Sequence, residues 1–194
     1  MNLPNKLTLG RLVLTLLFVI ALSVDFPSHK LVGLVLFILA AVTDYLDGLI
    51  ARRTGTVTTF GKLMDPLADK VMMAAAFVIL STEGLIAGWA VVAILAREFL
   101  VTGLRLVATS QGVVLAADSL GKLKTILQIA TAIFLLVVLA GQEPAVNDLS
   151  FESLIGAEAT RMTGLILVYL TVLTTIGSGL SYLFGNRKLF EGEM

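Results

Sequence analysis

Apolar residues fill six separate blocks of this chain and leave little sequence for a water-facing surface. The blocks cover residues 12–24, 31–43, 71–80, 85–96, 126–140 and 164–183, and 57% of the 194 residues are hydrophobic. A soluble domain of this length has a smaller apolar share. Several blocks are shorter than the roughly 20 residues that span a bilayer, but each reaches that length with its flanking half-polar turns. The pattern predicts an all-α integral membrane protein with six transmembrane helices in a single domain, residues 1–194.

The expected helices cover residues 8–24, 31–53, 61–80, 85–109, 119–140 and 159–184. Residues 2–10 are then a polar lead at the membrane surface. The first 23 residues also have features of a signal peptide, but five further spans follow without them, so we interpret them as the first span. For residues 141–158 we favour a solvated acidic loop, with a short surface helix around Phe151, Leu154 and Ile155 as the alternative.

Lysine and arginine are distributed unevenly between the two sides of this layout. Twelve of the fourteen fall in segments on the side of the N-terminus, and only Lys30 and Arg161 fall on the other side. Because cytoplasmic segments carry the excess of such residues, we expect both termini in the cytoplasm. The zero net charge gives no reason to expect a nucleic-acid partner. The absence of cysteine excludes a disulfide framework, and the lone His29 reads as a surface histidine.

Two pairs of aspartates lie at the cytoplasmic ends of the second and third expected helices. Asp44 and Asp47 are three residues apart and Asp65 and Asp69 are four apart, so each pair shares a helix face. A short loop joins the two helices, which brings the pairs to one depth. Carboxylates at the edge of a hydrocarbon layer are costly and usually functional. Four uncompensated charges there predict at least one divalent cation, and oxygen-only ligands favour Mg²⁺, Mn²⁺ or Ca²⁺.

Two plainer interpretations compete with a metal site. Asp65 followed by Pro66 has the form of a helix N-cap with proline at the first helical position. The aspartates could also form salt bridges with nearby basic residues, namely Arg52, Arg53, Lys62 and Lys70. Neither interpretation accounts for two aspartate pairs at helical spacing. Neither explains why small residues, namely Gly48, Ala51 and Gly61, lie on the same helix faces.

The stretch Asp44-x2-Asp47-Gly48-x2-Ala51-Arg52-x8-Gly61-x3-Asp65-x3-Asp69 resembles the full signature of the CDP-alcohol phosphatidyltransferases. The resemblance covers essentially the whole chain, including the six-helix layout with a cavity that faces the cytoplasm. It implies a phosphatidyl donor, CDP-diacylglycerol, whose lipid tails stay in the bilayer. It also implies a homodimer in the membrane.

The resemblance assigns roles to the residues of the signature. Asp44, Asp47 and Asp65 would bind two metal ions, Mg²⁺ or Mn²⁺. Asp69 would be the general base and would also touch a metal. The pocket for the cytidine diphosphate would be lined by Gly48, Ala51, Arg52 and Gly61.

The acceptor has to be inferred from other charges. Arg97, Glu98 and Arg105 lie inside the fourth expected helix, and Lys122 and Lys124 begin the fifth. Several cations around the inner mouth predict a second anion beside the donor, such as an acceptor that carries a phosphate. The plainer interpretations are that the two lysines are positive-inside anchors and that Arg97 forms an ion pair with Glu98.

Residues 2–8, 96–105 and 121–125 look like those of the bacterial phosphatidylglycerophosphate synthases within the family. The implied reaction joins CDP-diacylglycerol and sn-glycerol 3-phosphate to give phosphatidylglycerophosphate and CMP at a bacterial plasma membrane. Arg105, Lys122 and Lys124 would hold the acceptor phosphate, with Arg97 nearby and Glu98 orienting an arginine. Asn5, Thr8 and Arg11 would lie at the inner rim of the site.

Three alternatives remain at this stage. The first keeps the chemistry and changes the acceptor to inositol phosphate or phosphatidylglycerol. The second is a cation transporter, but transporters place their coordinating groups near the midplane, whereas these aspartates lie at helix ends. The third is an inactive relative that serves as a membrane scaffold, which four intact aspartates argue against.

Overall fold

The computed structural model describes residues 3–54, 59–110 and 119–185, with side chains at residues 7–44, 64, 67–109 and 120–185. Over the three backbone ranges the chain is helical, with short connections and no strand. The all-α class that the apolar blocks predicted is therefore confirmed.

One long helix forms around each apolar block. The long helices are α1 (Leu3–Ser23), α2 (His29–Thr54), α3 (Thr59–Thr82), α4 (Gly88–Ser110), α5 (Ser119–Ala140) and α7 (Ala157–Gly185). Their sequences are rich in leucine and alanine, which have high helix propensity, and isoleucine and valine fill the remaining apolar positions. Most boundaries lie within a few residues of the expected ones.

The start of α1 differs from the prediction. The helix begins at Leu3, so the polar lead expected over residues 2–10 is wrong from Leu3 onward. Pro4 lies in the first turn, where a helix does not need the backbone N–H that proline lacks. Gly10 has the lowest helix propensity among the residues that follow in this segment, and a single glycine does not end a helix.

The segment between α5 and α7 also differs from the loop that we favoured. It forms a 3-10 turn, η1 (Asn147–Leu149), followed by the short helix α6 (Phe151–Ile155). The Ser150 side chain caps α6, because its Oγ accepts a hydrogen bond from the Ser153 backbone N–H at 3.2 Å. Phe151 contacts Phe134 of α5 with ring centroids 5.2 Å apart, which attaches this helix to the bundle.

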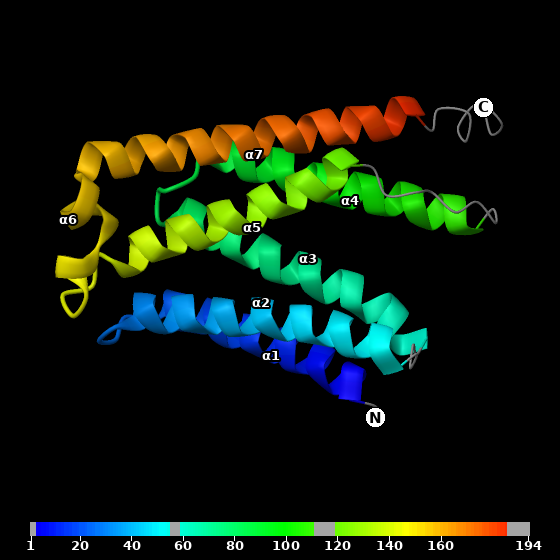
Figure 1. Cartoon of the computed structure of the whole chain (residues 1–194), viewed down its shortest axis with the longest axis horizontal. Coiled ribbons are helices and arrows are strands. Elements are labelled where there is room, and N and C mark those ends of the chain that lie inside the picture. The colour runs from blue at the N-terminus through cyan, green and yellow to red at the C-terminus, as the bar shows by residue number, and fades with distance from the viewer. Residues whose placement is uncertain (1–2, 55–58, 111–118, 186–194) are drawn as a thin grey trace.

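The long helices lie side by side, with α1 and α2 along one edge and α7 along the other (Figure 1). Helix α1 packs on α2 and α3, while α7 packs on α4 and α5. The start of α1 and the end of α7 lie at the same end of this bundle, which we call the terminal end (Figure 1). The turn between α1 and α2, together with η1 and α6, lies at the opposite end, which we call the far end (Figure 1).

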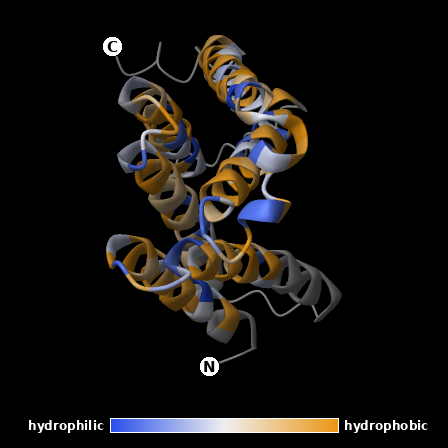
Figure 2. Ribbon diagram, turned by 90° about the vertical axis from the view of Figure 1, so that its left-hand side faces the viewer, coloured by the Kyte–Doolittle hydropathy of each residue, from blue (hydrophilic) through white to orange (hydrophobic). Residues whose placement is uncertain are grey.

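Apolar side chains occupy both the inside and the outside of the bundle. The core joins α1 to α5 and α7 through residues such as Phe18, Phe37, Phe77 and Leu136, each at most 1% exposed. Large apolar side chains such as Val92 and Leu173 are exposed, and hydrophobic residues cover much of the helix surfaces (Figure 2). A continuous apolar exterior is typical of helices that contact lipid.

Two of the described helical segments are long and apolar enough to cross a membrane, namely Leu120–Ala140 and Ala157–Gly185. A shorter apolar segment, Leu7–Ser23, lies in α1. Helices α2, α3 and α4 carry charged residues toward the terminal end, including Asp44, Asp69 and Arg97, which lower their mean hydropathy. Membrane-spanning helices are therefore supported.

Candidate active site

Asp44 of α2 is paired with an arginine from α1. Arg11 Nη1 lies 2.5 Å from Asp44 Oδ1, and the Arg11 side chain is 1% exposed while that of Asp44 is 44% exposed. A buried guanidinium without a carboxylate partner would be strongly destabilising. Thr8, one turn before Arg11, is buried as well. Arg11 and Thr8 thus lie between helices, deeper than the rim position expected for them.

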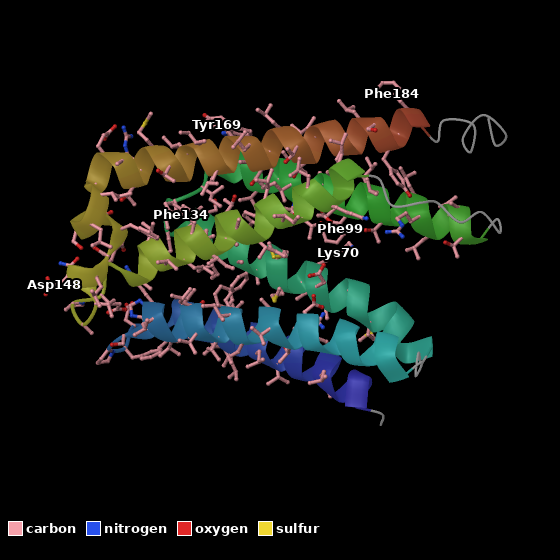
Figure 3. All side chains as sticks on the ribbon, viewed as in Figure 1. Lys70, Phe99, Phe134, Asp148, Tyr169 and Phe184 are labelled. Atoms are coloured by element: carbon pink, nitrogen blue, oxygen red, sulfur yellow. The ribbon has the colours of Figure 1, made fainter. Side chains whose placement is uncertain are left out.

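Asp69 of α3 lies close enough to Asp44 for their charges to interact. It also interacts with the charges of Arg11, Lys70 and Glu98. The structure therefore brings together one aspartate from each of the two expected pairs. Figure 3 places Lys70, the neighbour of Asp69, and Phe99 in the half of the bundle that ends at the terminal end.

The remaining residues of the signature lie on the same two helices. Asp47 follows Asp44 by one turn of α2, and Asp65 precedes Asp69 by one turn of α3. Because α3 begins at Thr59, Asp65 is inside the helix, and the alternative that it is an N-cap is wrong. The side chains of Asp47, Asp65 and Asn5, and the surroundings of Gly48, Ala51, Arg52 and Gly61, lie outside the described part.

Glu98 of α4 is the centre of a second charged cluster, which we call the Glu98 cluster. Its Oε1 accepts a hydrogen bond from Lys124 Nζ of α5 and a longer one from Gln128 Nε2 at 3.4 Å. Arg97 Nη1 lies 3.4 Å from the same oxygen. The ion pair between Arg97 and Glu98 that we considered for this arginine is thus present. Two cations and one carboxylate leave this cluster with one positive charge.

A cleft of about 580 Å³ opens beside the Glu98 cluster, within the range of small-molecule sites. Helices α3, α4, α5 and α7 line it, and its charged residues are Asp69, Lys70, Arg97, Glu98, Arg105, Lys122 and Lys124. The cations exceed the carboxylates by three. The cleft therefore suits an anion that carries more than one negative charge.

The four cations predicted for the acceptor meet in this cleft but differ in their surroundings. Arg97 and Lys124 are largely buried and belong to the Glu98 cluster. Arg105 and Lys122 are exposed, and within the described residues neither side chain has a hydrogen bond or a salt bridge. Arg105 and Lys122 are therefore the cations that can turn toward a ligand without breaking an existing ion pair.

A small cavity of about 30 Å³ lies behind Asp69. Its polar walls include Asp69, Glu98, Lys124 and Gln128, and Phe77 and Ile94 close its apolar side. This volume has room for about two water molecules, which need such polar partners. The cavity connects the proposed base to the Glu98 cluster.

Known proteins are similar to this chain along nearly its whole length. A model of the CDP-alcohol phosphatidyltransferases matches residues 1–177. The chain belongs to the CDP-alcohol phosphatidyltransferase family. It is 39% identical to the CDP-diacylglycerol–glycerol-3-phosphate 3-phosphatidyltransferase of Bacillus subtilis, over 98% of this chain and 97% of that protein. The protein of the same name from Rickettsia bellii is 33% identical, over 97% of each chain.

Members of this phosphatidyltransferase family use divalent metal ions. Asp44 and Asp69 fit such an ion, since carboxylate oxygens from adjacent helices are the hard donors that Mg²⁺ and Mn²⁺ prefer. Among the described side chains no three potential metal ligands gather, because those of Asp47 and Asp65 are not part of that set. Arg11 already offsets one of the negative charges at this site.

Some residues at the cleft were not predicted from the sequence. Gln128 of α5 and Ser178 of α7 hydrogen-bond to the Glu98 cluster, and Tyr182 lines the cleft. The sequence predicts this part of α7 only as a membrane span. The one available signal was the run Gly177-Ser178-Gly179, whose small residues allow another chain segment to approach a helix closely.

Proposed function

We propose that this protein transfers the phosphatidyl group of CDP-diacylglycerol to sn-glycerol 3-phosphate, giving phosphatidylglycerophosphate and CMP. The observation that carries this proposal is the full-length similarity to bacterial proteins of that name. The cleft supports it, because Asp69 lies at a surface with a strong excess of cations. A phosphomonoester acceptor carries between one and two negative charges at neutral pH and matches that excess.

The aspartates divide the chemistry among them in this proposal. Asp44, Asp47 and Asp65 hold two divalent ions, Mg²⁺ or Mn²⁺, with Asp69 at their edge. Bound ions of this kind neutralise a diphosphate and its leaving group. Arg11 keeps Asp44 oriented through its ion pair, so the carboxylate does not have to be ordered when the substrate arrives.

Asp69 acts as the general base. It accepts the proton of the acceptor hydroxyl while that oxygen forms a bond to the β-phosphorus of the donor. The bond between this phosphorus and the bridging oxygen breaks, and its electron pair leaves with CMP. Proton transfer by a positioned side chain contributes about 10²–10⁴-fold to a rate.

The two substrates occupy different parts of the site. The cytidine diphosphate lies along Gly48, Ala51, Arg52 and Gly61, where small residues permit close approach and an arginine pairs with phosphate. The acceptor phosphate lies in the cleft against Arg105 and Lys122, with Lys124 and Arg97 supplying a fixed positive field behind them. This division follows from which cations are already paired.

We further propose that α1 to α5 and α7 all cross a bacterial plasma membrane, with the terminal end in the cytoplasm, and that the protein is a homodimer. The segregation of lysine and arginine supports this orientation, because Lys30 and Arg161 belong to segments at the far end. The cleft then opens on the side where a water-soluble phosphomonoester can enter and CMP can leave.

Release of CMP by the purified protein in detergent, with CDP-diacylglycerol and Mg²⁺ or Mn²⁺, tests the proposed function. Glycerol 3-phosphate, inositol phosphate, serine and phosphatidylglycerol would each be offered as acceptor. We expect release with glycerol 3-phosphate. Release only with another acceptor would overturn the acceptor assignment and keep the chemistry, whereas no release with any of them would overturn the enzyme itself.

A further inference from the structure

Helix α7 passes very close to Arg97. A Cβ atom added at Gly179 would lie 2.9 Å from Arg97 Cγ, which is shorter than carbon atoms approach without strain. The neighbouring Ser178 is 1% exposed, and its Oγ accepts a hydrogen bond from Arg97 Nη2 at 2.5 Å. Two successive residues of α7 therefore fix both the stem and the tip of this arginine.

Arg97 is held in place even though its hydrogen bonding is incomplete. Its Nη1 points to Glu98, but its Nε is buried and has no hydrogen-bond partner among the described atoms. A buried donor without a partner is unfavourable, so the hydrogen bonds to Ser178 and Glu98 do not satisfy the whole guanidinium, and packing must contribute to the position of the side chain. The close approach at Gly179 is the packing contact that does this.

The position of Arg97 affects the rest of the Glu98 cluster. Arg97, Lys124 and Gln128 all contact the same oxygen, Glu98 Oε1. A shift of Arg97 would change where Glu98 lies, and Lys124 would follow because it is bound to the same oxygen. Lys124 lines both the cleft and the small cavity behind Asp69.

We propose that Ser178 and Gly179 are positioning residues of the acceptor site, so that α7 takes part in acceptor binding without touching the substrate. They fix Arg97, and Arg97 with Gln128 fixes Glu98 and Lys124 behind the acceptor phosphate. Arg97 and Lys124 then supply a positive field of constant direction behind Arg105 and Lys122. This inference rests on the proposed function for the identity of the acceptor, but not for the contact between α7 and Arg97.

The chain offers a matched pair of variants on one helix. Gly179→Ala puts a methyl group against Arg97 Cγ, whereas a methyl group at Gly177 would meet no atom within 4 Å. Both changes raise helix propensity equally, so a difference between them reports the contact. We expect Gly179→Ala to raise the KM for glycerol 3-phosphate by about 10-fold or more, since small misplacements of binding groups have effects of this size. The KM for CDP-diacylglycerol should change less than about 2-fold.

Kinetics of wild type, Gly177→Ala and Gly179→Ala in one assay separate the two proposals. An inactive wild type would overturn the proposed function. An active wild type with equal KM values in the two variants would overturn the positioning role. Ser178→Thr, which keeps the hydroxyl, should retain a lower KM for the acceptor than Ser178→Ala, and equal values would also contradict the role of Ser178.

Thermal unfolding in detergent tests the contact without turnover. We expect Gly179→Ala to lower the Tm of the wild-type protein. In an Arg97→Ala background the Cγ atom is gone, so the same substitution should no longer lower the Tm. An equal fall in both backgrounds would show that α7 does not act on Arg97, and would overturn the inference even if the protein proved inactive.

Discussion

The two ends of the bundle differ in how completely their charged residues are paired. At the far end, Glu143 is buried, accepts a hydrogen bond from the Lys30 backbone N–H at 3.0 Å, and lies 3.4 Å from His29 Nδ1. Lys30 Nζ in turn donates to Gln142 Oε1 at 2.7 Å. At the terminal end, Arg105 and Lys122 remain without hydrogen bonds among the described residues, and Asp44 and Asp69 repel each other.

This difference indicates which end contributes stability and which end contributes function. Polar groups that are fully paired hold the helix ends in place and have nothing left for a ligand. Charges that lack partners, or face like charges, lower stability until a substrate or ion completes them. Substitution of the buried, paired Glu143 at the far end should therefore lower the Tm and leave KM values alone, whereas substitution of Asp69, Arg105 or Lys122 at the terminal end should change the kinetics and leave the Tm nearly unchanged.

The largest effect is expected for Asp69→Asn. The amide cannot accept the hydroxyl proton, so kcat should fall by about 10²–10⁴-fold. Because the change removes a partly buried charge that interacts unfavourably with that of Asp44, the Tm should not fall. Binding of Mn²⁺ and of CDP-diacylglycerol should persist, measured by isothermal titration. Turnover at the wild-type rate would contradict the assignment of Asp69 as base.

A smaller effect is expected for Arg105→Ala and for Lys122→Ala. Each removes a charge-assisted hydrogen bond to the acceptor phosphate, worth about 1.5–3 kcal/mol, which corresponds to about a 10–100-fold rise in the KM for glycerol 3-phosphate. Initial-rate kinetics with each substrate varied would measure it. A rise confined to the KM for CDP-diacylglycerol would move these residues to the donor pocket.

The comparison of the ends also shows what the sequence could predict. The apolar blocks predicted the long helices. Whether a helix is buried or contacts lipid depends on its composition over many residues, and that composition can be read from the local sequence. The spacing within each aspartate pair predicted two helix faces that carry carboxylates, and in the structure one member of each pair, Asp44 and Asp69, lies close enough to the other for their charges to interact.

Contacts between helices distant in the chain were not predictable in this way. Nothing in the spacing of α4 and α7 indicates that Ser178 meets Arg97, since that pair depends on how α7 crosses α4. The burial of Arg11 against Asp44 was missed for the same reason. The start of α1 was misplaced because polar residues near Thr8 suggested a surface segment, whereas Pro4 is compatible with a first helical turn.

At the far end, Glu143→Ala should lower stability and leave catalysis unchanged. The substitution leaves the Lys30 backbone N–H without its acceptor, at a cost of about 1–3 kcal/mol. For a chain of this size that corresponds to a fall in Tm of roughly 2–10 °C. Glu152→Ala, at an exposed residue of α6, is the matched control and should shift the Tm much less. A raised KM for either substrate in Glu143→Ala would break the division between the two ends.

The smallest effect is expected for Arg161→Ala. Arg161 Nη2 lies 3.1 Å from Glu158 Oε1, but the two side chains are 68% and 75% exposed, so water replaces the lost ion pair. The Tm in detergent should stay within error of the wild type, and both KM values should be unchanged. A fall in Tm as large as that of Glu143→Ala would show that this exposed pair stabilises α7, and burial would then not explain why Glu143 matters. The comparison between a buried and an exposed pair at the same end thus tests whether pairing alone, or pairing together with burial, makes the far end stable.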